Sequence, residues 1–478
     1  MNHYGKFYID GQWVDPLSSR KAFELVNPAT EEVFASVAMG GADDVDRAVK
    51  SARAAFAAFS ATSKAERVAQ LQRIVRALEE REGDLMQAAT QQMGAPQSAV
   101  GVVRTAIDAF RQAALTLTSY EFETRMGPHL IRREPIGVCG LITAWNHPVQ
   151  ILCTKLASAL AAGCTVVAKP SEFTPVSAIQ LAEVLHAAGL PKGVFNLVNG
   201  DGPTVGHAIS SHPDVEMVSF TGSTRAGVLI AQAAAPTVKR VCQELGGKSA
   251  NIILPDADLA AAVRWNVARG CSNSGQSCHS PTRILVHESQ LEQVLGLAAA
   301  EMNKVVVGDP LHEATTMGPV VNKAQFERVQ EYIGKGIEEG ARLVCGGLGR
   351  SRGLERGYFV QPTLFAEVTP DMTIAREEIF GPVLAVMTYR TEDEAIEIAN
   401  GTVYGLGAYL FTSDPQRGHA VGARLRAGRV FFNGAPSSPD APMGGYKQSG
   451  NGREMGVFGL EEYLEVKAMF GFPASATA

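Results

Sequence analysis

The feature that most constrains this chain is a repeated alternation of short apolar runs with segments of helical periodicity. The apolar runs of the first half are 137–144, 164–168, 194–198 and 215–220, and the helical segments between them are 149–162, 175–188 and 203–210. Such alternation is typical of βαβ units, in which helices join buried parallel strands. Because parallel strands are covered on both faces, they read as continuous apolar runs.

A second alternating series begins after a glycine pair, Gly246-Gly247. Its expected strands are 250–254, 283–287, 383–389 and 430–433, and its expected helices are 259–269, 290–304, 323–339, 392–399 and 415–425. An early strand or hairpin at 6–14 and amphipathic helices near 42–59 and 68–78 precede the first series. For 478 residues we therefore expect an α/β fold with two large domains that meet near residues 246–248.

Charge and hydropathy restrict the classes of partner that the chain can bind. The formal net charge is −6, with both signs spread along the chain, which argues against a nucleic-acid or anionic-membrane partner. The first ten residues carry no apolar leader region, and there is no apolar run of 18 residues or more. We expect a cytoplasmic protein.

Seven cysteines are present, with no CxxC pair. The odd number and the expected reducing compartment favour free thiols. Cys139, Cys153 and Cys164 lie in apolar runs and are expected in the core, and we interpret Cys271 as structural. Cys278 differs because it ends a polar, glycine-containing loop, where a nucleophilic thiol is accessible. Since adjacent side chains usually point apart, we expect His279 to form part of the pocket wall.

Glycine-rich segments suggest where phosphate could bind. Gly247-Lys248-Ser249 lacks the earlier glycine of a P-loop, and the glycines of 200–206 miss the dinucleotide fingerprint by one residue. The turn 220–227 is a better candidate, because it ends a strand and opens a helix with small residues. No HExxH, CxxC or histidine cluster predicts a metal.

Seven motifs, taken in their order along the chain, together resemble those of one protein superfamily. They are Ala144-Trp145-Asn146-His147-Pro148, Lys169-Pro170-Ser171-Glu172, the 220–227 turn, Glu244-Leu245-Gly246-Gly247-Lys248, Gly275-Gln276-Ser277-Cys278, Glu378-Ile379-Phe380-Gly381-Pro382 and 444–450. From about Phe7 to Lys467 the chain resembles the aldehyde dehydrogenase superfamily. The resemblance implies a Rossmann-type NAD-binding domain (1–114 and 134–246), an α/β catalytic domain (247–448) and a small β oligomerisation hairpin (115–133 and 460–478). It also implies a homodimer or homotetramer.

By this resemblance, Cys278 attacks an aldehyde as a thiolate and forms a thiohemiacetal, which hydride loss converts to a thioester. Asn146 and the backbone N–H of Cys278 stabilise the oxyanion, and Glu244 is the general base that activates water. Glu454 and Lys155 match positions sometimes assigned to a proton relay.

The resemblance also implies a cofactor site for NAD. Lys169 and Glu172 hold the adenosine ribose, and the carboxylate of Glu172 repels a 2′-phosphate and so favours NAD over NADP. Glu378 holds the nicotinamide ribose beside Phe380. The remaining implied cofactor contacts are Ile142, Thr143, Trp145, Ser171, Gly202, Phe220, Gly222, Ser223, Gly227 and Leu245.

Departures from the family pattern fall in the implied substrate tunnel. The residues at tunnel positions are His147, Ile151, Thr154, Ser277, His279, Ser437, Ser438 and Met443. Several of these positions are aromatic in enzymes for simple aliphatic aldehydes. We therefore expect a wider, more polar tunnel for a bulky or polar-ended aldehyde, such as a semialdehyde or an aryl aldehyde.

Three alternatives compete with this interpretation. A CoA-acylating relative generally lacks the glutamate base, and a non-catalytic descendant would lose Cys278 or Glu244, whereas both residues are present here. A cysteine hydrolase without cofactor would leave Lys169, Glu172 and Glu378 unexplained.

Overall fold

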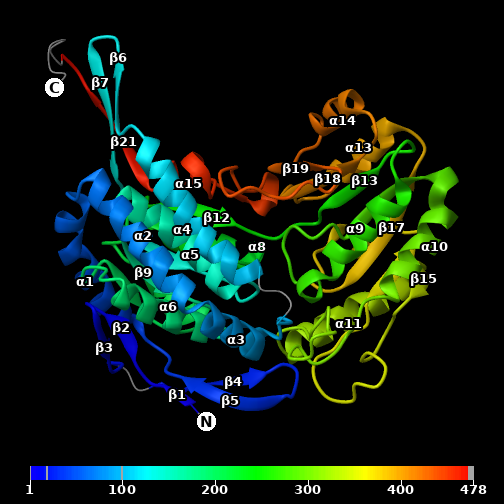
Figure 1. Ribbon diagram of the computed structural model, residues 1–478, viewed down its shortest axis with the longest axis horizontal. Helices are drawn as coiled ribbons and strands as arrows, with labels where there is room; N and C mark the ends of the chain where they lie inside the picture. Colours follow the sequence, from blue (N-terminus) through cyan, green and yellow to red (C-terminus); the bar gives the residue numbers. More distant parts are fainter. Residues whose placement is uncertain (1, 18–19, 98–100, 472–478) are drawn as a thin grey trace.

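The computed structural model describes residues 2–17, 20–97 and 101–471, and it contains two large sheets side by side (Figure 1). The first sheet has the order β20 (Gly450–Asn451), β12 (Arg240–Glu244), β11 (Met217–Thr221), β8 (Val138–Ile142), β9 (Thr165–Lys169), β10 (Phe195–Leu197), β2 (Phe7–Ile9) and β3 (Gln12–Val14). The five strands from β12 to β10 are parallel, which confirms the βαβ prediction for the first half.

Helices cover both faces of this sheet. They are α1 (Ala42–Ser60), α2 (Lys64–Glu80), α3 (Glu82–Met93), α4 (Gly101–Ser119), α5 (Pro148–Ala162), α6 (Val176–Ala187), α7 (His207–Ser211) and α8 (Thr224–Ala234). Side chains alternate across the sheet, so Cys139 and Leu141 join the core formed with α2 to α6, while Val138 and Ile142 join the core formed with α1 and α7. The cysteines predicted for the core, Cys139, Cys153 and Cys164, are all buried.

The second sheet has the order β15 (Arg342–Cys345), β16 (Thr363–Ala366), β17 (Val383–Tyr389), β14 (Arg283–His287), β13 (Ala250–Ile253), β18 (Gly407–Phe411) and β19 (Arg429–Phe432). Only β15 runs antiparallel to its neighbour. Its helices are α9 (Leu259–Cys271), α10 (Leu291–Met302), α11 (Lys323–Glu338), α12 (Thr373–Arg376), α13 (Glu392–Asn400) and α14 (Pro415–Gly422).

Two small sheets complete the structure. One pairs β21 (Leu464–Met469), β7 (His129–Pro135) and β6 (Glu123–Met126) into an arm that projects from the body beside α15 (Gly456–Glu462), as Figure 1 shows. The other pairs β1 (Asn2–Tyr4), β5 (Glu32–Val37) and β4 (Phe23–Asn27).

The starting residue predicted for the oligomerisation hairpin was wrong. We expected it to begin at residue 115, but 115–119 form the last turn of α4 and the first strand begins at Glu123. Leu117 is fully buried in the core shared with α5, so packing stabilises the helix there over the extended form. Of the C-terminal element expected at 460–478, residues 472–478 lie outside the described residues.

Candidate active site

The residues singled out from the sequence gather where the two large sheets meet. Parallel strands of the first sheet end at Ile142, Lys169, Thr221 and Glu244, and ligands of open α/β sheets bind outside these carboxyl ends. The loops that precede β14 and β17 of the second sheet carry Cys278 and Glu378, respectively. Contacts across this junction join the two sets.

Cys278 lies in a turn after α9 whose backbone is tightly bent. Asn273, Ser274 and Gly275 all have positive φ, and Gly275 lies so close to Gly381 that a Cβ would come within 2.1 Å of its carbonyl carbon. Gly247 makes a second close approach, since a Cβ there would lie 2.4 Å from the Cys278 carbonyl oxygen. Side chains larger than hydrogen at either glycine would displace this turn.

Burial raises the pKa of the Cys278 thiol to about 12, and the carboxyl groups of Glu378 and Glu244 contribute to the rise as nearby like charges. The backbone N–H groups of Cys278 and His279 act in the opposite direction and favour the thiolate. Both effects require the thiol to lie close to the two carboxyl groups and to these N–H donors.

Asn146 precedes His147, the N-cap of α5, and is hydrogen-bonded to the loop that carries Cys278. Its Nδ2 donates to the Gln276 carbonyl oxygen at 3.2 Å, and its own carbonyl oxygen accepts from Asn273 Nδ2 at 3.0 Å. Gln276 is in turn fixed, because its Oε1 accepts from the Val321 N–H at 2.9 Å. The amide of Asn146 uses one N–H to hold this orientation and retains the other.

Glu244 ends β12 and is buried at 3 % exposure, and neither carboxyl oxygen has a hydrogen-bond partner among the described residues. Burial raises the pKa of Glu244 well above its usual value, and the charge of Glu454 raises it further. Lys155 opposes this shift. A buried carboxyl group with a raised pKa and no fixed partner is suited to accept a proton as a general base.

Lys155 and Glu454 form a buried ion pair behind Glu244. Lys155 Nζ contacts Glu454 Oε1 and also donates to Ser219 Oγ at 3.0 Å, so this side chain links α5 to β11 and to the loop before α15. The lysine side chain is fully buried and that of the glutamate is 10 % exposed. The two residues matched to a proton relay in the sequence are therefore paired beside the carboxyl group of Glu244.

A second cluster lies at the end of β9. Lys169 Nζ donates to the carbonyl oxygens of Pro170 and Gly200 at 2.8 Å each, and it lies 3.6 Å from Glu172 Oε2. Burial lowers the pKa of Lys169, and Glu172 counteracts the shift. Ser171 is buried, whereas the Glu172 side chain remains 23 % exposed and can accept hydrogen bonds from a ligand.

The turn between β11 and α8 is open to a ligand on its outer side. Ser223 caps α8, because its Oγ accepts from the Ala226 N–H at 3.3 Å, and Gly222 lies against the Phe220 ring with no room for a Cβ. Gly227 allows Leu245 to approach the helix closely. Gly202, the other predicted glycine, begins a π-helical turn (Gly202–Gly206) and is exposed.

Glu378 and Phe380 close the junction from the second sheet. The Gly247 N–H donates to Glu378 Oε1 at 3.0 Å, and Gly246 leaves room for Oε2. Burial raises the pKa of Glu378 to about 7. The ring of Phe380, a residue with φ 63°, lies nearly perpendicular to the Trp145 ring, with 5.3 Å between the ring centroids. Behind Trp145, the Thr143 N–H donates to the Lys169 carbonyl oxygen, which holds the segment after Ile142 against β9.

Comparison with known proteins decides the family. The model of the aldehyde dehydrogenase family matches residues 13–469. The chain belongs to the aldehyde dehydrogenase family. A 3-succinoylsemialdehyde-pyridine dehydrogenase from a Pseudomonas species is 52 % identical, over 99 % of this chain and all of the relative.

Solved structures that resemble this chain are also aldehyde dehydrogenases. An aldehyde dehydrogenase mutant from Pseudomonas syringae, in complex with NAD+ and octanal, is 55 % identical with a TM-score of 0.97, over 99 % of this chain and 98 % of the other. The enzyme of Mycobacterium tuberculosis, complexed with NAD+, is 41 % identical with a TM-score of 0.96, over the full length of both.

In this aldehyde dehydrogenase, the residues at tunnel positions lie on three segments. His147, Ile151 and Thr154 follow one face of α5 from its N-cap, whereas Ser437 and Ser438 are exposed on the loop after β19. Met443 pairs through its backbone with Glu454. The structure thus places Thr154, but not the two serines, in a buried position.

His279 departs from our expectation that it points away from the nucleophile. Its Nδ1 lies 3.9 Å from Cys278 Sγ, and its Nε2 lies 2.9 Å from an Arg269 guanidinium nitrogen. Burial, and then the charge of Arg269, lowers the pKa of His279 to about 3, and His147 is similarly lowered to a pKa of about 4. Both rings are therefore neutral at physiological pH, which suits pocket walls.

Sequence reasoning missed the amides that support the site. Asn273 and Gln276 hold Asn146, whereas the sequence shows them only as parts of a polar loop. Their one signal is their position beside Cys278. Across the described ranges there is no group of three His, Cys, Asp or Glu side chains arranged to hold a metal ion, and no helix there has the length and apolarity needed to span a bilayer.

Proposed function

We propose that this enzyme oxidises an aldehyde to the carboxylic acid with NAD, through covalent catalysis by Cys278. The observation that carries the proposal is the convergence of the Cys278 thiol, the Asn146 amide and the unpartnered carboxyl group of Glu244 at one junction of the described structure. Nucleophile, oxyanion donor and base are the three groups that acyl chemistry requires.

The proposed steps use these residues in turn. The Cys278 thiolate adds to the carbonyl carbon, and the oxygen gains the electron pair and accepts hydrogen bonds from Asn146 Nδ2 and the Cys278 N–H. NAD, when bound, supplies the acceptor for the hydride that leaves this carbon. Glu244 then removes a proton from water, whose oxygen attacks the thioester and releases the acid and the thiol.

Several side chains fit the cofactor. Glu172 follows β9 and Glu378 precedes β17, and each carboxyl group can accept hydrogen bonds from ribose hydroxyls, while the capped N-terminus of α8 at Ser223 suits a pyrophosphate. Lys169 lies beside Glu172 and is fixed by two carbonyl oxygens. Because Glu172 carries a negative charge, it disfavours the 2′-phosphate of NADP.

The proposed substrate is an aldehyde with a bulky or polar-ended remainder, such as a semialdehyde or an aryl aldehyde. Small polar side chains stand at Thr154 on α5 and at Ser277 beside Cys278, and neutral His147 and His279 add polar walls. A relative named for 3-succinoylsemialdehyde-pyridine, at 52 % identity, supports this class. The octanal complex of the Pseudomonas syringae enzyme supports a tunnel that accepts a long aldehyde.

The test is NADH formation with purified enzyme. Wild type should form NADH from NAD and an aldehyde without CoA, and Cys278→Ala should abolish this activity while retaining NAD binding by calorimetry. NADH formation that requires CoA would indicate acyl transfer to CoA instead of hydrolysis. Unchanged turnover of Cys278→Ala would refute the covalent role.

We further propose the division into an NAD-binding domain (1–114 and 134–246), a catalytic domain (247–448) and an oligomerisation element (115–133 and 460–478), except that 115–119 belong to α4. The projecting arm has open edges at β6 and β21, and Met126 and Val466 on it are each 66 % exposed. Such edges favour pairing with a second copy, as a homodimer or homotetramer.

A further inference from the structure

The imidazole ring of His279 lies between the nucleophile and an arginine. Its Nε2 lies 2.9 Å from an Arg269 guanidinium nitrogen, and its Nδ1 lies 3.9 Å from Cys278 Sγ. Arg269 belongs to the last turn of α9, a few residues before the turn that carries the thiol. The ring therefore bridges the end of this helix and the reacting sulfur.

Arg269 determines which nitrogen of the ring carries the proton. A guanidinium group has only N–H donors, has no acceptor and stays protonated in proteins. Nε2 of His279 must therefore accept the hydrogen bond from Arg269, and a neutral imidazole that accepts at Nε2 carries its proton on Nδ1. The ring is neutral at physiological pH, since its pKa is about 3. An Nδ1–H group thus faces the Cys278 sulfur.

Tyr409 of β18 holds both His279 and the arginine in place. Its hydroxyl donates to the His279 carbonyl oxygen at 2.7 Å, and the Arg269 guanidinium faces the same hydroxyl. The tyrosine is buried and packs against Trp265 of α9, with 5.0 Å between the ring centroids. The orientation of the imidazole is therefore set by a packed helix and a packed strand.

The Nδ1–H group has two acceptors within reach. Ser277 Oγ lies 3.4 Å from Nδ1, nearer than the Cys278 sulfur at 3.9 Å. A neutral thiol is a weak acceptor, so the serine hydroxyl competes well while Cys278 is protonated. Hydrogen bonds to an ionised acceptor are shorter and about twice as strong. When Cys278 loses its proton, the Nδ1–H group therefore favours the sulfur.

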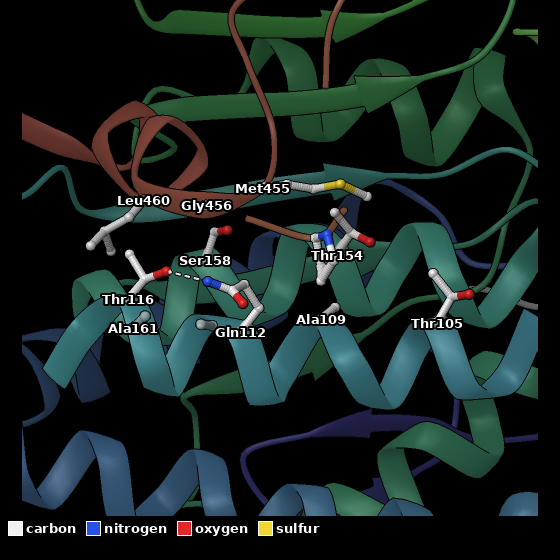
Figure 2. A pocket seen from close by; sticks show the side chains of 12 residues that line it. Thr105, Ala109, Gln112, Thr116, Thr154, Ser158, Ala161, Met455, Gly456 and Leu460 are labelled. Atoms are coloured by element: carbon white, nitrogen blue, oxygen red, sulfur yellow. Dashed lines mark hydrogen bonds between the residues drawn. The ribbon is translucent and has the colours of Figure 1, made fainter. Parts of the chain in front are cut away.

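Charged groups around His279 keep its ring neutral. Burial and the charge of Arg269 disfavour a second proton on the ring, and His147 at the N-cap of α5 and Arg429 in β19 act in the same direction. Beyond Thr154 on α5, a narrow crevice toward α4 is lined by uncharged side chains in the described part of the chain (Figure 2). The ring therefore stays a neutral donor.

We propose that His279 is a further catalytic residue, which donates a hydrogen bond from Nδ1–H to the Cys278 thiolate, and that Arg269 is a positioning residue, which holds this tautomer. The inference rests on the proposed function and deepens it. The donated bond offsets part of the effect of the Glu378 and Glu244 carboxyl groups on the thiol. His279 does not take the thiol proton, because Nδ1 already carries a proton and Nε2 faces the guanidinium. It thus differs from the histidine base of a cysteine–histidine pair.

The first test measures the rate at which iodoacetamide labels Cys278 in the free enzyme at pH 8, where the rate follows the thiolate fraction. His279→Leu removes the donor and should slow labelling by about tenfold or more, the effect of one hydrogen bond to a charged group. His279→Asn should stay close to the wild-type rate, because its amide nitrogen, like Nδ1, is bonded to Cγ and carries N–H. An equal or faster rate in His279→Leu would overturn the donor role.

The second test reads the tautomer directly by ¹⁵N NMR of the imidazole rings, with the His279 signals identified by their absence in His279→Leu. Wild type should carry the proton on Nδ1, and Arg269→Met should move it wholly or partly to Nε2, whereas Arg269→Lys keeps a donor and should retain Nδ1–H. Arg264→Met removes a positive charge from the exposed face of the same helix and should leave the tautomer and the labelling rate unchanged. A proton on Nε2 in wild type would overturn the proposal.

A double variant separates the tautomer from the charge of Arg269. Arg269→Met should slow labelling in wild type more than it does in the His279→Asn background, because the N–H of an amide does not depend on a tautomer. Equal effects in the two backgrounds would mean that the arginine acts through its charge alone and would overturn its positioning role. NADH formation from an aldehyde by wild type tests the proposed function separately, since neither labelling nor NMR requires substrate or cofactor.

Discussion

The protonation state of Cys278 leads to a prediction that requires neither substrate nor cofactor. Its pKa is raised from 9.0 to about 12, a difference that corresponds to about 4 kcal/mol against the thiolate. At pH 8 the thiolate fraction would be about a thousandfold smaller than that of an unperturbed cysteine. Since only the thiolate reacts with iodoacetamide, labelling of Cys278 in the free enzyme should be slow by a comparable factor.

The assay measures the rate of iodoacetamide labelling of the Cys278 peptide by mass spectrometry between pH 6 and pH 10. The rate should rise about tenfold per pH unit above pH 8 and less steeply near pH 7, where Glu378 ionises, with no plateau, whereas an ordinary thiol levels off above its pKa. The chain unfolded in urea provides the reference at each pH. A plateau near pH 9, or labelling as fast as in the unfolded chain, would refute the reasoning.

A variant distinguishes the electrostatic effect from restricted access. Glu378 is the leading charged cause of the raised pKa of Cys278, and its own pKa is about 7. Glu378→Gln should therefore accelerate labelling above pH 7, where the wild-type carboxylate is charged, and should have little effect at pH 6. An equal acceleration at both pH values would indicate improved access instead.

Three further predictions follow from contacts of the site. Glu172→Ser should improve kcat/KM for NADP relative to NAD by at least about tenfold, because like charges about 4 Å apart repel by up to about 4 kcal/mol near a protein surface; an unchanged ratio would show that Glu172 does not select the cofactor. Lys155→Met should lower the free energy of unfolding, measured by urea titration, by about 3–5 kcal/mol, because it leaves the buried Glu454 carboxylate without its ion-pair partner. The double variant with Glu454→Gln should recover most of this lost stability. If the second substitution does not reduce the loss, the ion pair is not its cause. Gly247→Ala should lower kcat sharply, since the new Cβ would lie 2.4 Å from the backbone carbonyl oxygen of Cys278. Gly83→Ala in α3 is the control, because a Cβ there would meet no neighbouring described atom within 4 Å, and it should leave steady-state kinetics unchanged. Equal effects of the two substitutions would contradict the close approach at Gly247.

The central strands could be predicted from the sequence because burial on both faces leaves a continuous apolar run. β8 and β9 are buried at every position, and both were predicted to within two residues. β16 and β18 were missed, although they are just as buried and of similar length. The family resemblance placed the start of the hairpin at residue 115, but Leu117 packs into the core and the segment 115–119 is helical.

The sequence by itself determined the family and the chemical groups that the site can offer. Cys278, Glu244 and Asn146 stand in motifs whose order along the chain indicates an aldehyde dehydrogenase, and the family match over residues 13–469 confirms that membership. The roles of nucleophile, base and oxyanion donor follow from the same motifs as predictions. Motifs of this kind are local, so a single sequence suffices to find them.

Tertiary structure alone decided the state of those groups. Glu244 lacks a partner for either oxygen among the described residues because β12 places it inside the protein. Cys278 has its raised pKa because the surrounding protein desolvates its thiolate and because Glu378 arrives from a loop a hundred residues further along the chain. Burial and proximity depend on how distant segments pack, and for that reason a local motif contains neither the pKa of a group nor the shape of the space around it.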